Sequence, residues 1–203
     1  TIHKALPITD GKALASLPAG TVKDFPQYNY RGFMIDVGRH FFPKEYLKEL
    51  IDVMALHNIN YFHWHLTDDQ GWRIEIRKYP KLTEIGSVRS RTLIGRDPGG
   101  TYDENCKFDE TPYGGYYTQD EIRDVVNYAA ERFITVIPEI DLPGHSRNIA
   151  SVHPEIRCNY PPDTVSTNGY DYRSAWCVAR EENYALLADI LGELCALFPS
   201  EYI

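Results

Sequence analysis

Side chains that can do chemistry follow two apolar stretches of the chain. Asp68 and Asp69 come just after the aromatic run Tyr61–Leu66, and Arg39 follows a second run that includes Asp36. Both runs have the length and apolar content of buried strands. Carboxylates at a strand end beside aromatic residues suit a polyhydroxylated ligand, because ionised carboxylates accept hydrogen bonds from hydroxyl groups. The sequence therefore predicts a polar ligand site at these strand ends.

A third apolar run carries more acids and then a histidine. Glu139 and Asp141 alternate at its end, so both are expected to face the same side as an acid pair. The turn over residues 141–144 is predicted to direct His145 back over the strand ends. A hydrogen bond from Asp68 to His145 would then fix the tautomer of the imidazole and tune its pKa.

Each of these residues also has a structural interpretation. Arg39 can pair with Asp36 at the surface, instead of donating its planar guanidinium to two hydroxyl groups or a carboxylate. Asp68 and Asp69 can cap the turn in which they lie. His145 can cap backbone groups of its own loop. The residue types alone leave these alternatives open.

Two further pairs of residues have competing explanations. His63 and His65 lie on one strand face and, with His145, fit a metal-dependent barrel hydrolase, although packing within an aromatic strand is the favoured interpretation. Trp64 and Trp72 are interpreted either as rings that stack on a sugar or as core residues.

The segments that position these residues alternate between strands and helices. Strands are predicted over Phe33–Val37, Tyr61–Leu66 and Phe133–Ile137, and helices over Lys44–His57, from the capping box Thr118–Glu121 and from Glu181. This order predicts an α/β fold with parallel strands. Residues 70–117 are predicted to be mostly a functional loop, and Tyr202–Ile203 to open a fourth strand.

Polar groups at the same end of three parallel strands are typical of a (β/α)8, or TIM, barrel, whose chemistry lies on that face. A full barrel has eight strands and typically about 250 residues. The chain has 203 residues and three predicted β/α units, so we expect a truncated barrel over residues 26–203. Residues 1–25, with several prolines and glycines, are interpreted as a linker or the tail of a preceding domain.

Composition restricts the partners. The net charge is −8 and no cluster of Lys or Arg offsets it, which argues against nucleic acid and anionic membranes. No apolar run is long enough to span a membrane, and the N-terminus lacks the apolar segment of a signal peptide.

The four cysteines include no Cys-x-x-Cys pair, which argues against a zinc ribbon. Cys195 lies on an apolar helical stripe and is predicted to be core. Cys158 and Cys177 flank a loop rich in Pro, Gly and Tyr, and they can form a disulfide only in an oxidising compartment.

Several motifs, in order and in register, resemble glycoside hydrolase family 20, the β-N-acetylhexosaminidases. They are Arg31–Pro43, His63–Arg73, Gly115–Ile122 and Pro138–His145. The resemblance implies a (β/α)8 barrel that removes terminal, non-reducing N-acetylglucosamine or N-acetylgalactosamine and retains configuration by substrate-assisted catalysis. It also implies that neither a metal nor an organic cofactor takes part.

In this family the acetamido oxygen of the substrate attacks the anomeric carbon, a glutamic acid protonates the leaving oxygen, and the aspartate before it orients the acetamido group. By resemblance, Arg39 matches the arginine that binds hydroxyls of the terminal sugar. Asp68 and His145 match residues hydrogen-bonded to the acid glutamate. Asp69 and Glu139 are carried over as neighbouring substrate-binding residues.

One departure from the family pattern affects activity. The Asp-Glu pair of the family follows the fourth strand, whereas this sequence stops at Ile203, where that strand is expected to start. The pairs Asp103–Glu104, Asp109–Glu110 and Asp120–Glu121 are predicted in a loop or at a helix start. We therefore expect the chain alone to be inactive, with a non-catalytic carbohydrate-binding protein or the metal-dependent hydrolase as the alternatives.

Two more expectations concern the state of the protein. A partial barrel leaves helix faces and strand edges uncovered, so the chain is expected to self-associate. The parent protein is expected to be periplasmic or secreted, as family members that act on external glycans commonly are. The sequence does not separate the gluco from the galacto substrate.

Overall fold

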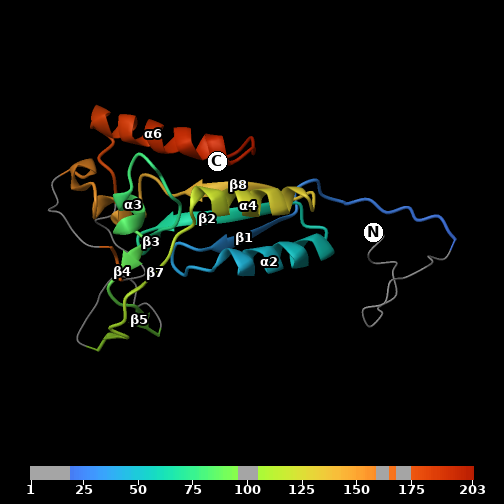
Figure 1. Ribbon diagram of the computed structural model, residues 1–203, viewed down its shortest axis with the longest axis horizontal. Helices are drawn as coiled ribbons and strands as arrows, with labels where there is room; N and C mark the ends of the chain where they lie inside the picture. The colour runs from blue at the N-terminus through green and yellow to red at the C-terminus, as the bar shows by residue number, and fades with distance from the viewer. Residues whose placement is uncertain (1–18, 96–104, 159–164, 168–174) are drawn as a thin grey trace.

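A central strand organises the computed structural model (Figure 1). The structure describes residues 19–95, 105–158, 165–167 and 175–203. Strand β2 (Tyr61–Asp68) pairs in parallel with β1 (Gly32–Asp36) on one side and with β8 (Thr135–Ile140) on the other. The short strand β3 (Gly71–Trp72) turns back antiparallel to the end of β2. The predicted parallel α/β arrangement is therefore confirmed, while the described residues do not form a closed barrel.

Three long helices connect or follow the parallel strands. They are α2 (Lys44–Leu56), α4 (Gln119–Ala130) and α6 (Glu181–Leu197). Because α4 contacts both α2 and α6, the helices lie side by side in chain order (Figure 1). The capping box predicted for α4 is confirmed, since the side chains of Thr118 and Glu121 each bond to the other residue's amide. Within the described ranges, no helix combines the length and the apolar character required to cross a membrane.

The segment between β2 and α4, predicted to be mostly loop, contains several short elements. They are β3, α3 (Lys81–Glu84), β4 (Val88–Arg89), β5 (Leu93–Ile94), β6 (Lys107–Phe108) and β7 (Tyr113–Gly114). β4 pairs with β7 and β5 pairs with β6, both antiparallel. After β8 follow α5 (Arg147–Ala150) and the 3₁₀-helix η1 (Pro154–Ile156).

The third strand begins later than predicted because helix α4 ends in a C-terminal cap. Phe133 has a φ of 59°, in the left-handed region, and is exposed. The amide of Ile134 donates to the carbonyl of Ala129, which closes the helix end. The extended backbone starts only at Thr135 and continues to Ile140, past the predicted end of the strand at Ile137. Glu139 therefore lies inside β8, rather than after it.

The core settles two predictions about aromatic and cysteine side chains. Trp64 and Trp72 are buried, and Trp64 packs edge-on against the ring of Tyr117 at 4.8 Å between centroids, so both tryptophans are core residues. The prediction that Cys195 is core was wrong. Cys195 is exposed because α6 directs other residues of its apolar stripe, such as Leu194, inward.

The predicted strand at Tyr202–Ile203 is absent from the described C-terminal residues.

A buried arginine ties several of these segments together. The guanidinium of Arg73 is fully buried and donates to the carbonyls of Val37 at 2.9 Å, Gly38 at 2.8 Å and Gly115 at 3.0 Å, and also to that of Ser87. Burial lowers the pKa of Arg73 to about 10, so the group remains charged at neutral pH. One side chain thus fixes the loop after β1 against the segments around β4 and β7.

Replacing Arg73 with leucine is expected to lower the free energy of unfolding by at least about 3 kcal/mol, because each buried carbonyl left without a donor costs about 1–3 kcal/mol. Urea denaturation measures the change. Arg123→Leu is the matched control: this arginine is 43% exposed in its side chain and pairs with Asp120 on the surface of α4. The control is expected to cost about 1 kcal/mol or less, and equal losses in the two variants would contradict the role of Arg73.

Candidate active site

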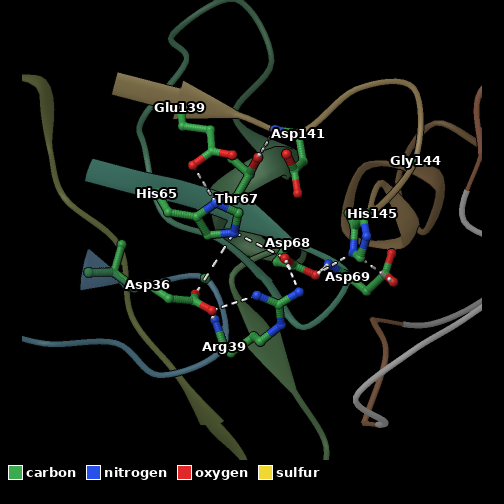
Figure 2. Close-up of polar contacts among 12 residues, drawn as sticks. Asp36, Arg39, His65, Thr67, Asp68, Asp69, Glu139, Asp141, Gly144 and His145 are labelled. Atoms are coloured by element: carbon green, nitrogen blue, oxygen red, sulfur yellow. Dashed lines mark hydrogen bonds and ion pairs between the residues drawn. The ribbon is translucent and has the colours of Figure 1, made fainter. Parts of the chain in front are cut away.

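The predicted site residues meet at the carboxyl ends of the parallel strands (Figure 2). The strand register aligns Asp36 of β1 with His65 of β2, and His65 with Glu139 of β8. Asp68 ends β2, and the loop after β8 returns to it. The residues brought together include every one predicted for the site, namely Arg39, Asp68, Asp69, Glu139 and His145.

Asp68 is the fully buried centre of the cluster, and both of its oxygens are engaged. Oδ1 accepts the amide of Asp69 at 2.7 Å and lies 3.2 Å from Nδ1 of His145. Oδ2 lies 2.7 Å from Nη2 of Arg39 and 3.0 Å from Nε2 of His65. Burial alone would raise the pKa of Asp68, but the hydrogen bond from His65 and the charge of Arg39 lower it below its usual value. Asp68 is therefore a carboxylate, not a carboxylic acid.

Arg39 contacts two carboxylates: Asp36, the surface partner considered from the sequence, and the buried Asp68. Its Nη1 lies 2.6 Å from Oδ2 of Asp36, while its Nη2 reaches Asp68. The side chain is 43% exposed, so the guanidinium is open to solvent beside these contacts. Burial opposes the charge, but the hydrogen bond to Asp36 and the charge of Asp68 raise the pKa of Arg39. A planar cation held on one side by two carboxylates can donate to ligand hydroxyls on the other.

The predicted hydrogen bond between Asp68 and His145 is confirmed at 3.2 Å. His145 has a φ of 51°, which is uncommon for a residue with a side chain and is found at functional sites. The loop before it contains the cis peptide Leu142–Pro143. This backbone returns the imidazole over the end of β2, where its side chain is 39% exposed.

Asp69 supports the loop that carries His145. Its buried carboxylate accepts the amide of Arg147, at the start of α5, at 3.0 Å. Its carbonyl accepts the amide of Ser166 at 3.1 Å. Asp69 therefore holds two segments of the chain that follow β8, which is close to the capping interpretation. Its contact with a substrate stays a prediction.

Glu139 interacts with both histidines of β2. Its Oε2 lies 2.5 Å from Nε2 of His63 and 2.8 Å from Nδ1 of His65. Burial would raise the pKa of Glu139, but the hydrogen bond from His65 and the charge of that ring lower it. The neighbouring Asp141 behaves differently, because burial and the charges of Glu139 and Asp68 raise its pKa. The predicted acid pair thus combines two carboxyl groups with opposite pKa shifts.

His65 is the residue whose importance the sequence did not reveal. It was interpreted as a packing residue or a metal ligand, whereas its ring bridges two carboxylates. The His65-x-x-Asp68 spacing was visible, but contact with Glu139 depends on strand register.

Among the described residues, two groups have ligand atoms close enough together for a metal ion. They are His65, Asp68 and Asp141, and Asp68, Asp69 and His145. Both groups use Asp68, whose oxygens already contact Arg39, His65 and a backbone amide. The set of His63, His65 and His145, which the metal-dependent alternative requires, is not one of these groups. The expected absence of a metal stays a prediction.

The sequence profile described as "Glycosyl hydrolase family 20, catalytic domain" matches residues 28–203. The chain belongs to glycosyl hydrolase family 20. A beta-hexosaminidase of Porphyromonas gingivalis is 42% identical over 190 residues, which cover 92% of this chain and 22% of that protein. A beta-hexosaminidase of Vibrio furnissii is 43% identical over 92% of this chain and 30% of its own length.

Solved structures give the same family assignment. A β-N-acetylhexosaminidase structure superposes with a TM-score of 0.77 at 37% identity, covering 87% of this chain and 35% of that one. The family-20 exo-β-N-acetylglucosaminidase of Vibrio harveyi, in complex with N-acetylglucosamine, has a TM-score of 0.71 at 41% identity, covering 87% of this chain and 27% of that one. The chain thus spans about a third or less of each of these relatives.

Replacing Asp68 with asparagine is expected to lower the free energy of unfolding at pH 7 by about 3–5 kcal/mol, because it leaves the buried His65 and part of Arg39 without their counter-charge. Chemical denaturation of the two proteins gives the difference. Asp120→Asn serves as the control, since that side chain is 87% exposed, and about 1 kcal/mol or less is expected. A loss at Asp68 as small as that of the control would show that the cluster is not held by its charges.

Proposed function

We propose that the full-length protein that carries this chain is a retaining β-N-acetylhexosaminidase. Its substrates are glycans with terminal, non-reducing N-acetylglucosamine or N-acetylgalactosamine, cleaved by attack of the substrate's own acetamido oxygen. The observation that carries the proposal is the Arg39–Asp68–His145 arrangement at the strand ends. Membership of family 20 and relatives that are called beta-hexosaminidase support it.

Arg39, Asp68 and His145 have different roles in this proposal. Arg39 donates hydrogen bonds from its exposed guanidinium to hydroxyls of the terminal sugar. Asp68 is buried and ionised, so it fixes the tautomer and direction of the His145 ring. His145 then contacts the glutamic acid that protonates the leaving oxygen, in line with the resemblance to the family.

That glutamic acid and the aspartate before it are proposed to lie outside this chain. In the described residues, Asp109 accepts the amide of Thr92 across the β5–β6 pair and that of Thr111 nearby, and Glu121 belongs to the capping box of α4. Neither side chain is therefore available as the acid. The pair Asp103–Glu104 lies outside the described residues. We propose that residues 26–203 are the first part of the catalytic (β/α)8 domain and that residues 1–25 link it to a preceding segment.

The experiment compares the 203-residue chain with the full-length protein on a chromogenic N-acetylglucosaminide. The full-length protein is expected to release the chromophore, and the chain alone is expected to release none, because it lacks the proton donor. In the full-length protein, Arg39→Leu is expected to lower kcat/KM by roughly ten- to a hundredfold, since a hydrogen bond to a charged group contributes about 1.5–3 kcal/mol. Arg91→Leu, which removes an exposed pair with Glu110, is the control.

Other outcomes would favour the alternatives. Turnover by the chain alone would refute the proposed position of the acid. Binding of N-acetylglucosamine by the full-length protein without any turnover would favour a carbohydrate-binding protein. Activity that is lost on chelation and restored by zinc would favour the metal-dependent hydrolase. Activity that Arg39→Leu leaves unchanged would remove Arg39 from the site.

We also propose that the isolated chain self-associates. Phe33 and Met34 on β1 are exposed, and within the described residues β1 pairs only with β2. An uncovered apolar strand edge is a template for pairing with another chain. Sedimentation velocity is expected to show an average mass that rises with concentration, and Met34→Lys is expected to reduce the rise. A concentration-independent monomer would contradict the proposal.

Export of the full-length protein to the periplasm or outside the cell is proposed by analogy with the family. The structure has Cys158 and Cys177 as free thiols that share a hydrogen bond, which raises the pKa of Cys158 and lowers that of Cys177. These side chains are close to each other, and their disulfide stays a prediction that requires an oxidising compartment.

A further inference from the structure

His65 occupies an unusual position between two carboxylates. Its Nδ1 lies 2.8 Å from Oε2 of Glu139 on β8, and its Nε2 lies 3.0 Å from Oδ2 of Asp68 at the end of β2 (Figure 2). Oδ1 of Asp36 on β1 is 3.9 Å from the same Nε2. The side chain is only 6% exposed. Three neighbouring strands therefore direct acids toward one buried imidazole.

The chemistry of the ring decides its protonation state. A neutral imidazole has one N–H donor and one acceptor nitrogen, whereas an ionised carboxylate can only accept. A neutral His65 would therefore direct a lone pair at one of its two carboxylates. Asp68 and Glu139 do not carry the missing proton, because both have lowered pKa values and further partners, Arg39 and His63 respectively. A ring protonated on both nitrogens satisfies both contacts.

We propose that His65 is a positioning residue, protonated on both ring nitrogens at neutral pH, that holds Asp68 in the orientation that receives His145. The consequence for catalysis rests on the proposed function. The protonation state does not, because it is argued from the contacts of the ring with Asp68 and Glu139 and needs no substrate.

The positioning role follows because the two oxygens of Asp68 have different partners. With Oδ2 held by His65, Oδ1 remains directed at His145. Arg39 also contacts Oδ2, but it is partly exposed and is the residue proposed to bind the sugar. His65 is only 6% exposed, so its contact with Asp68 does not compete with a ligand that binds on the exposed side of the site.

The charges around the ring give the expected pH dependence. The groups that face it are Asp36 on β1, Asp68 on β2 and Glu139 on β8, with Asp141 further along and the cation Arg39 opposite. Burial lowers the pKa of His65, but the hydrogen bonds to Asp68 and Glu139 outweigh it and raise the pKa to about 9. Because the pKa in the folded protein lies above the usual histidine value of 6.5, the stabilisation is complete below about pH 6.5 and is lost as the pH rises through about 9.

The first test measures the protonation state directly by nitrogen NMR of the full-length protein with 15N-labelled histidine. The His65 signals are identified by their loss in His65→Gln. Both ring nitrogens are expected to be protonated at pH 7.5. The ring is expected to lose one of these two protons near pH 9, and the signals of both nitrogens should report this midpoint. Glu139→Gln is expected to lower that midpoint by at least about one unit, because it removes one accepting charge. A wild-type ring with one protonated nitrogen at pH 7.5 would overturn the proposal.

The second test measures kinetics across pH, with His63→Gln as the matched control. His63 contacts the same Glu139, but it is 35% exposed and lacks the contact with Asp68. Below pH 8, His65→Gln is expected to lower kcat about tenfold with little change in KM, because one charge-assisted hydrogen bond to Asp68 is weakened. Above pH 9 the variant and the wild type are expected to converge, because the wild-type ring has also lost its charge.

A ratio between His65→Gln and wild type that stays constant at all pH values would indicate a merely structural role and overturn the positioning proposal. An equal loss in His63→Gln would do the same. If the full-length protein has no hexosaminidase activity, the proposed function fails, but the NMR result still decides the state of His65. The two proposals can therefore fail separately.

Discussion

The buried carboxylate of Asp68 is the interaction on which the site depends. An ionised acid inside a protein is strongly unfavourable unless cations and donors compensate it. Asp68 has four such partners: a backbone amide, Arg39, His65 and His145. Meeting this requirement draws together the loop after β1, the strand β2 and the loop after β8. The geometry of the proposed sugar site is therefore a result of neutralising one charge.

The strand order supplies those partners in a simple way. Parallel strands end at the same edge, so residues that finish β1, β2 and β8 meet without long connections. Gly38, in the loop after β1, lies so close that an added Cβ would be 3.0 Å from both the Cβ and the amide nitrogen of Asp68. The absence of a side chain there lets the loop carry Arg39 within reach of the buried acid.

Much of this arrangement could be predicted from local pattern. Apolar runs ending in acids located the strand ends, and the short turn before His145 predicted its contact with Asp68. The role of His65 could not be predicted, because it depends on a register between β2 and β8 that no local pattern specifies. The start of β8 was predicted too early, because nothing about a phenylalanine indicates that Phe133 adopts a left-handed backbone conformation.

Arg73 escaped prediction for a different reason, because a fully buried guanidinium is rare and its partners are backbone carbonyls. Its hydrogen bonds to Val37 and Gly38 hold the two residues just before Arg39. Arg39, the residue proposed to bind the sugar, is therefore positioned by a second arginine that is closed off from solvent. If Arg39 binds the sugar as proposed, substitutions at Arg73 would weaken the same binding by displacing Arg39. Arg73 could then be mistaken for a ligand contact, although its side chain is fully buried.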